Sequence, residues 1–237
     1  MAGSIITPEM AVSQEKRPVN WAGNLTYSTG KVLVPRTVPE VQQMVSNAKS
    51  LKVQGTRHCF NTIADSRDTL LMTAGLDKVI SLDKQARLVT VESGIRYGQL
   101  AVYLEKEGFA LHNLASLPHI SVAGACATAT HGSGDGNGNL ATAVTALEMV
   151  TGTGELVTIS RDKDPSIFYG AVVGLGALGI VTKMTLEVQP TYAVRQDVYE
   201  NMPMSVLKEN FEDIFSAGYS VSIFTDWRNK NLNEIWI

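Results

Sequence analysis

A histidine follows a glycine-led turn at the end of a short apolar run in the segment KVQGTRHCFN, residues 52–61. Gly55 and the polar residues after it place several backbone amides in a concave turn of the kind that binds phosphate. Imidazole titrates near neutral pH, so an uncharged ring nitrogen of His58 can act as a nucleophile. The other interpretation is an ordinary loop histidine, with Arg57 beside it as a solvated cation rather than a phosphate ligand. These residues alone leave both interpretations open.

A second segment with little side-chain bulk covers residues 113–140, NLASLPHISVAGACATATHGSGDGNGNL. Residues 123–127 are nearly all alanine or glycine, so their backbone amides can approach a large flat or phosphorylated ligand. The alternating glycines at 132–138 predict a loop. A long surface loop without a function is the alternative, but such loops are uncommon inside compact domains. The composition therefore favours a ligand-binding segment.

The segment GLGALG, residues 174–179, matches the G-x-G-x-x-G pattern of dinucleotide-binding proteins. That pattern requires a strand before the glycines and a helix after them. Here a helix is expected before the glycines, and a strand over residues 180–190 follows them. The order is reversed, which disfavours a nicotinamide dehydrogenase. A tight turn, at which the backbone approaches a ligand or another segment, explains the glycines better.

The four histidines, His58, His112, His119 and His131, all lie within one stretch of the sequence. Their spacings match no common metal-binding pattern, and neither a cysteine pair nor a carboxylate cluster accompanies them. No metal site is therefore predicted. His112, His119 and His131 are interpreted as packed or turn histidines rather than catalytic ones.

Short strands and helices must position these segments. A capping-box pattern at Thr37 and Glu40 and apolar residues at helical spacing predict a helix over residues 37–50. Asp164 and Pro165 predict the start of another helix. Further helices are expected at 97–108 and 204–218, and strands at 31–35, 51–55, 69–94, 141–160, 180–190, 192–200 and 219–227. Because several strands follow one another directly, the pattern predicts an α+β architecture rather than a doubly wound sheet.

The composition is that of an ordinary globular protein, with 44% hydrophobic and 18% charged residues among 237. A net charge of -3 disfavours nucleic acid as a partner. The N-terminus lacks the basic start and continuous apolar stretch of a secretory signal, and no window approaches the roughly 18 apolar residues of a membrane span. Two cysteines, Cys59 and Cys126, cannot form a disulfide framework, so a reduced, cytoplasmic setting is expected.

Five segments of the chain stand in an order that is typical of one enzyme family. They are NWAGN (20–24), GTRHCFN (55–61), NLASLPHISVAGACATATHGSG (113–134), GLGALGIVT (174–182) and YSVSIFTDW (219–227). Together they resemble the alditol (xylitol) oxidases, which belong to the vanillyl-alcohol oxidase or p-cresol methylhydroxylase-type FAD-binding superfamily. The SLPHISVAG block is the most specific of these motifs, whereas the glycine motifs alone are weak.

The resemblance implies an FAD-binding domain of two α+β subdomains over residues 20–190. Residues 1–19 are expected to be a flexible lead-in, and residues 191–237 to begin a substrate or cap domain. The segment LNEIWI, residues 232–237, reads as an apolar strand cut off without a partner or a turn. That domain is therefore expected to be truncated.

The resemblance also implies a covalently bound FAD. In the family, the histidine that matches His58 carries the flavin through its 8α-methyl carbon. Ser116 matches a position that faces the substrate beside the flavin. The family's FAD contacts fall on Val53, Gln54, Gly55, Thr56, Arg57, His58, Cys59, Ser121, Gly124, Ala125, Cys126, Ala127 and Ile180.

Two residues depart from the family pattern, which has a glycine before the histidine and a serine after it. Arg57 stands in place of the glycine, and its Cβ favours negative φ, which predicts a differently shaped loop. Cys59 stands in place of the serine, and its thiol is a weaker hydrogen-bond donor than a hydroxyl.

The activity implied is that of an FAD-dependent oxidase, which converts a primary hydroxyl of a sugar alcohol to the aldose and reduces oxygen to hydrogen peroxide. A sugar-lactone oxidase, such as a D-arabinono-1,4-lactone oxidase, and a non-catalytic FAD-binding fragment are the alternatives. The expected partners are a polyol or lactone and molecular oxygen, with no nucleic acid. The family's catalytic groups match positions beyond Ile237, so the chain is expected to bind FAD but to lack most of the substrate site.

Overall fold

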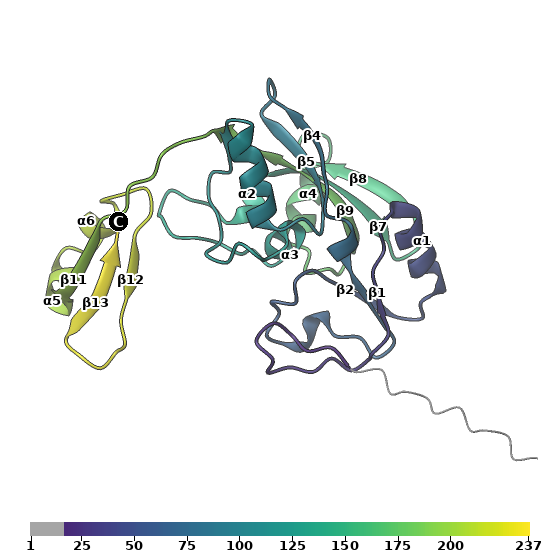
Figure 1. Cartoon of the computed structure of the whole chain (residues 1–237), viewed down its shortest axis with the longest axis horizontal. Helices are drawn as coiled ribbons and strands as arrows, with labels where there is room; N and C mark the ends of the chain where they lie inside the picture. Colours follow the sequence, from purple (N-terminus) through teal and green to yellow (C-terminus); the bar gives the residue numbers. More distant parts are fainter. Residues whose placement is uncertain (1–16) are drawn as a thin grey trace, which may run out of the picture.

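The computed structural model describes residues 17–237, which form two larger α+β subdomains and a third, smaller unit (Figure 1). The first subdomain is built on a three-stranded parallel sheet in the order β1-β3-β2. Its elements are β1 (Val32–Leu33), α1 (Val38–Asn47), β2 (Leu51–Gln54) and β3 (Thr69–Met72). The predicted flexible lead-in lies, for residues 1–16, outside the described residues.

Helix α1 begins where the capping pattern places it. The Thr37 hydroxyl accepts a hydrogen bond from the amide of Glu40 at 3.3 Å. The Glu40 carboxylate reaches back to the amide of Arg36 at 2.8 Å, one residue before the cap, so the predicted reciprocal bond is shifted by one position. The helix buries Val41 against Leu71 of β3 and against the second subdomain. Local capping and a single apolar face therefore fix this helix.

The second subdomain is a five-stranded antiparallel sheet in the order β4-β5-β9-β7-β8. Three helices pack on it and bury their apolar residues against β5, β7 and β9 in the largest core of the described residues (Figure 1). Its elements are β4 (Val79–Asp83), β5 (Leu88–Glu92), α2 (Tyr97–Lys106), α3 (Val122–Ala127), β7 (Val144–Thr151), β8 (Leu156–Ser160), α4 (Pro165–Ala171) and β9 (Gly179–Glu187), with the small pair β6 (Phe109–Ala110) and β10 (Gln189–Pro190). The predicted α+β class is confirmed. The segment 113–140, for which a long surface loop was the alternative, contains the short helix α3.

Two residues of α2 give a matched test of this core. Leu100 is fully buried, whereas Val102 on the same helix is 59% exposed. We expect Leu100→Ala to lower the free energy of unfolding by about 2–5 kcal/mol, because it removes buried methyl groups and leaves a cavity. Val102→Ala should change it by less than about 0.5 kcal/mol. Urea unfolding measures both; equal effects would contradict the placement of the core.

The third unit is a three-stranded antiparallel sheet with two short helices, at the left of Figure 1. Tyr219 and Ser222 join it by hydrogen bonds to His112 and Ser133 of the second subdomain. Its elements are β11 (Val198–Pro203), α5 (Met204–Glu209), α6 (Phe211–Phe215), β12 (Ser222–Phe224) and β13 (Asn231–Trp236). It has a separate small core around Val221, Leu232 and Ile235. The domain boundary after residue 190 stays a prediction.

The prediction of an unpaired apolar strand at 232–237 is wrong. Strand β13 lies in the middle of this sheet and pairs with β11 on one side and with β12 on the other. Leu232 and Ile235 are buried, because they face the small core. The sequence pattern showed an apolar strand but could not show that two earlier segments return to flank it.

The single helix predicted over 204–218 is also wrong, because the chain breaks it at Asn210. This residue takes a non-helical conformation, with φ -129° and ψ 35°. Its side-chain amide donates to the carbonyl of Val206 at 2.9 Å. Asparagine side chains compete in this way with the helical backbone. The strand predicted over 192–200 likewise begins only at Val198.

In the described part of the chain, no helix is long and apolar enough to cross a membrane.

Candidate functional site

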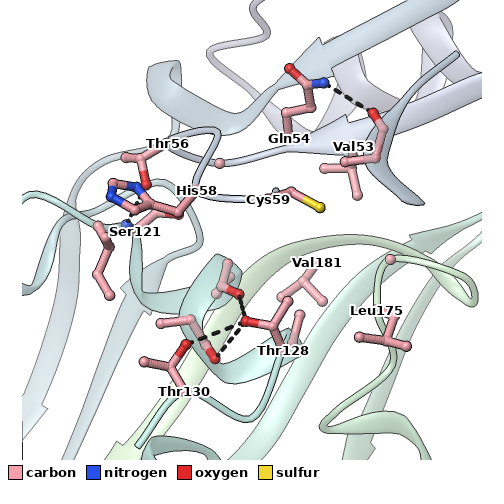
Figure 2. Close-up of a pocket in the computed structure, with 18 of the residues that line it drawn as sticks. Val53, Gln54, Thr56, His58, Cys59, Ser121, Thr128, Thr130, Leu175 and Val181 are labelled. Atoms are coloured by element: carbon pink, nitrogen blue, oxygen red, sulfur yellow. Dashed lines mark hydrogen bonds between the residues drawn. The ribbon is translucent and has the colours of Figure 1, made fainter. Parts of the chain in front are cut away.

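A cavity of about 620 Å³ opens between the two larger subdomains (Figure 2). Three segments form most of its wall: the end of β2 and the turn after it (53–59), residues 115–128 including α3, and the turn between α4 and β9 (174–179). Each of these segments is expected from its composition to approach a ligand. The fold therefore gathers three distant glycine-bearing stretches around one space.

Most of the residues predicted to contact cofactor or substrate line this cavity. They are Val53, Gln54, Gly55, Thr56, Arg57, His58, Cys59, Ser116, Ser121, Gly124, Ala125 and Ala127.

The side chains of two predicted residues lie elsewhere. Cys126 is fully buried with its sulfur 3.5 Å from the Tyr97 hydroxyl, and burial raises the pKa of its thiol to about 11. Ile180 packs with Val41 in the core between the subdomains. The helix and the strand that carry these two side chains turn them away from the cavity. Contact of FAD with Cys126 and Ile180, which their backbone can still make, stays a prediction.

Gly55, Ser121 and Gly124 meet at one point of the wall. A Cβ on Gly55 would lie 2.1 Å from the Ser121 Oγ, and a Cβ on Gly124 would lie 2.7 Å from the same oxygen. A methyl group at either position would therefore force the Ser121 side chain to move. The Ser121 Oγ is buried and has no hydrogen-bond partner in the described part of the chain. Buried polar groups are normally paired, so this hydroxyl is available to a ligand.

Further donors around the cavity are free. Among residues 17–237, no acceptor takes a hydrogen bond from the backbone amides of residues 56–59. The hydroxyl of Tyr27, a wholly buried wall residue, also lacks a partner there. Burial raises the pKa of Tyr27, so the group stays a neutral donor. Several unpaired donors around one cavity suit a ligand with many acceptor oxygens, such as a diphosphate.

Arg57 adopts a positive φ of 63°, the left-handed conformation that glycine takes most easily. The expectation that its Cβ would keep φ negative is wrong. The carbonyl of Arg57 accepts a hydrogen bond from the amide of Trp21 at 2.9 Å, which helps to hold the turn in this conformation. A neighbouring segment thus imposes the backbone path that the residue itself disfavours.

Arg57→Gly is expected to stabilise the fold. Relief of left-handed strain contributes about 1–2 kcal/mol, and the extra freedom of glycine in the unfolded chain offsets about 0.5–1 kcal/mol of it. We expect the free energy of unfolding to rise by about 0.5–1 kcal/mol in thermal or urea unfolding. Arg67→Gly is the control, since Arg67 has no positive φ and should lose stability. A lower free energy of unfolding in both variants would contradict the presence of backbone strain at Arg57.

His58 stands at the end of this turn between two other rings. Its ring stacks on Trp21 with centroids 4.5 Å apart, and its Nε2 lies 3.3 Å from the Nε2 of His119. Burial and then His119 lower the pKa of His58, while the carbonyl of Thr56 acts in the opposite direction. The imidazole is therefore mostly neutral at neutral pH, as a nucleophile must be. The Nδ1 of His58 is buried and unpaired within the described residues.

The NWAGN segment clamps the backbone on both sides of His58. The side-chain amide of Asn20 donates to the carbonyl of Cys59 at 3.1 Å, and the amide of Trp21 donates to the carbonyl of Arg57 at 2.9 Å. Asn20 is buried despite its polarity. A buried, fully engaged asparagine of this kind fixes the position of the residues that it binds.

The thiol of Cys59 points to Asn61, whose side-chain oxygen lies 3.2 Å from the sulfur. The thiol is thus engaged within its own turn. Its weaker donor strength therefore matters little for a ligand, while the backbone amide of Cys59 stays available.

Sequence reasoning missed several residues of the site. It treated His119 as a packed or turn histidine and gave Trp21 no role. It also passed over Thr128 and Thr130, whose hydroxyls line the cavity 3.3 Å from each other (Figure 2). Trp21 and His119 reach His58 from distant segments, so only their positions inside the family motifs could have drawn attention to them.

Across residues 17–237, no group of three or more histidine, cysteine, aspartate or glutamate side chains is arranged to hold a metal ion.

Known proteins resemble this chain in sequence and in fold. A family model described as an FAD binding domain matches residues 30–160. The alditol oxidase of Streptomyces sp. (strain IKD472 / FERM P-14339) is 43% identical over 221 residues, which are 92% of this chain and 52% of that protein. A putative D-arabinono-1,4-lactone oxidase of Neurospora crassa is 31% identical over 208 residues, 86% of this chain and 37% of that protein. The chain thus spans about half, or less, of the length of these relatives.

A solved structure gives the fold independently. A histidine-to-alanine mutant of cholesterol oxidase from Brevibacterium sterolicum superposes with a TM-score of 0.79 at 19% identity, covering 93% of this chain and 47% of that one. The two α+β subdomains are those of the p-cresol methylhydroxylase-type FAD-binding fold. The chain therefore belongs to the FAD-binding domain family with this fold, and it is similar to the alditol oxidases.

Proposed function

We propose that this chain is the FAD-binding part of an oxidase of the alditol oxidase type, which acts on a primary hydroxyl of a sugar alcohol. The cavity wall carries the proposal. Gly55, Ser121 and Gly124 pack so closely that a methyl group on either glycine would displace the Ser121 side chain, whose buried hydroxyl is unpaired among the described residues. The SLPHISVAG segment, which is the most specific part of the resemblance, supplies two of these three residues.

The residues present fit FAD. The free amides of residues 56–59 and the hydroxyl of Ser121 suit the diphosphate, since backbone amides in a turn bind phosphate oxygens. Small residues from 123 to 127 and the turn at 174–179 leave the rest of the cavity open to large, mostly apolar rings. When bound, FAD supplies a two-electron acceptor for the alcohol carbon, and oxygen takes the electrons on to hydrogen peroxide.

His58 is the residue that we propose to bond covalently to the flavin. Its backbone is clamped from both sides, its ring is stacked, and its pKa is lowered by burial. These features hold an uncharged imidazole nitrogen in one place. Ser116 lies exposed on the same wall, where it can orient a substrate hydroxyl. A cytoplasmic location belongs to the same proposal; the free state of both cysteines supports it.

A sugar-lactone oxidase is the second candidate, because lactone oxidases match over most of this chain. The D-arabinono-1,4-lactone oxidase of Yarrowia lipolytica is 33% identical over 86% of this chain and 40% of that protein. Its identity is lower than that of the alditol oxidase, which favours a polyol. A non-catalytic FAD-binding fragment is the third candidate.

Anaerobic bleaching of the bound flavin separates these candidates. The purified chain should be yellow, and xylitol or sorbitol should bleach it faster than D-arabinono-1,4-lactone. Faster bleaching by the lactone would favour the second candidate, and bound flavin that neither compound bleaches would favour a fragment without a complete substrate site. A folded, colourless chain that takes up no added FAD would overturn all three.

A further inference from the structure

His58 and His119 form a pair of imidazoles that joins two separate segments of the cavity wall. Their Nε2 atoms are 3.3 Å apart, within hydrogen-bond distance, and their ring centroids are 4.8 Å apart. The ring of Trp21 stacks on both, at 4.5 Å from His58 and 5.6 Å from His119. An indole that covers two rings at once restrains both from turning.

A hydrogen bond between two neutral imidazoles requires one proton between their facing nitrogens. Either His58 donates from Nε2, which leaves its Nδ1 with a free electron pair, or His119 donates and His58 carries its proton on Nδ1. Only the first arrangement leaves a nucleophilic nitrogen on His58. The tautomer of this one residue therefore decides whether it can form a bond.

Burial selects between the two arrangements. The carbonyl of Thr56 lies near enough to the ring to raise the pKa of His58, but it makes no hydrogen bond of good geometry with Nδ1. The Nδ1 is buried and otherwise has no partner among the described residues, so a proton there would be a poorly satisfied buried donor. The Nδ1 of His119 is not among the buried unpaired atoms, and no group in residues 17–237 bonds it, so it can hold its proton toward solvent. A buried donor without a partner is more costly than a buried acceptor without one. The favoured arrangement has His58 as the donor and His119 as the acceptor.

We propose, on the basis of the covalent FAD site proposed above, that His119 is a positioning residue: its Nε2 accepts a hydrogen bond from the Nε2–H of His58 and thereby keeps the Nδ1 of His58 unprotonated. Trp21 holds the two rings in the geometry of this bond. Nothing else among the described side chains contacts the Nε2 of His58 as an acceptor.

The two histidines would also take part in forming the covalent bond to the flavin. His58 forms a bond from Nδ1 to the 8α carbon of FAD, and that carbon loses one hydrogen as a proton. His58 gives its Nε2 proton to His119, which passes a proton to solvent through Nδ1. The lone pair of Nδ1 would form the new C–N bond, and the electron pair of the broken N–H bond would stay on Nε2. The electron pair of the broken C–H bond would reduce the flavin ring, which would take up two protons. Molecular oxygen then removes two electrons and two protons as hydrogen peroxide.

The test compares variants of His119 that differ in whether they offer a hydrogen-bond acceptor to the Nε2–H of His58. His119→Phe keeps an aromatic ring beside Trp21 but removes the acceptor, whereas His119→Gln places an amide oxygen near the position of Nε2. His112→Gln is the matched control, since His112 lies outside the cavity wall. Flavin-free chain is mixed with FAD, and the acid-stable flavin is followed over time by visible spectrum and intact mass.

We expect His119→Phe to attach FAD about tenfold more slowly than the unchanged chain, the effect of one lost hydrogen bond, while reversible FAD binding is retained. His119→Gln should restore most of the rate, and His112→Gln should leave it unchanged. Nitrogen-15 NMR of the flavin-free chain gives a readout that needs no FAD: the His58 signals should show a proton on Nε2 and none on Nδ1.

Attachment by His119→Phe at the unchanged rate, or a proton on the Nδ1 of His58 in the flavin-free chain, would overturn the role of His119 and leave the proposed function standing. Failure of the unchanged chain to bind FAD at all would instead remove the proposed function, and with it this role. The two failures are therefore distinct.

Discussion

Replacing His58 with alanine is expected to leave no flavin in the acid-precipitated protein, whereas the unchanged chain should keep its flavin in the pellet. The imidazole is the only part of the proposed attachment that the substitution removes. The backbone clamps from Asn20 and Trp21 bind carbonyls rather than the histidine ring, so they survive it. Reversible FAD binding should therefore persist and appear in the supernatant.

The measurement is a visible spectrum of the washed pellet and of the supernatant after acid precipitation. His131→Ala is the control, because His131 is another imidazole on the cavity wall. It should retain the flavin in the pellet. A yellow pellet from His58→Ala, or a colourless one from His131→Ala alone, would place the attachment elsewhere.

Gly55→Ala is expected to damage the site through a single methyl group. The new Cβ would lie 2.1 Å from the Ser121 Oγ and 3.3 Å from the Ser121 Cβ, so the wall must open there. Overpacking of this kind costs about 1–3 kcal/mol, which corresponds to a loss of FAD affinity of about fivefold to 150-fold if the cost falls on the bound state. Titration of flavin-free chain with FAD, followed by flavin fluorescence, measures this loss.

The double variant Gly55→Ala with Ser121→Ala should recover part of the affinity, since it removes the oxygen at 2.1 Å. Gly136→Ala is the control for the substitution itself, because a Cβ there meets nothing within 4 Å. Normal FAD binding by Gly55→Ala would show that the diphosphate does not depend on this point of the wall. An equal loss of FAD affinity in Gly136→Ala would show that the effect is unrelated to crowding against Ser121.

Much of the fold was predictable because its signals are local. Thr37 and Glu40 mark a helix start by their own side chains, and alternating apolar residues mark β5 and β9. The break at Asn210 was not predicted, because a side chain that bonds its own backbone four residues back competes with a helix that the apolar pattern favours. The partners of β13 were missed, because pairing depends on where distant segments return.

In the candidate site, too, local features could be predicted from the sequence and contacts between distant segments could not. Glycine and alanine content predicted which segments would approach a ligand, and those segments form the cavity wall. The contact of His58 with His119 spans 61 residues of sequence, and neither residue carries a local sign of the other. The positive φ of Arg57 was opposite to expectation, since a hydrogen bond from Trp21 overrides the preference of the residue.

The central place of β13 has a consequence for the order of events during synthesis. The strand follows both of its partners in sequence, yet it carries all of their pairing in this sheet. While the ribosome makes the chain, β11 and β12 emerge first and have no strand to join. The two larger subdomains can assemble by then, because their strands have already emerged. The third unit must wait for residue 236, and until then its apolar segments are exposed to chaperones and to other nascent chains.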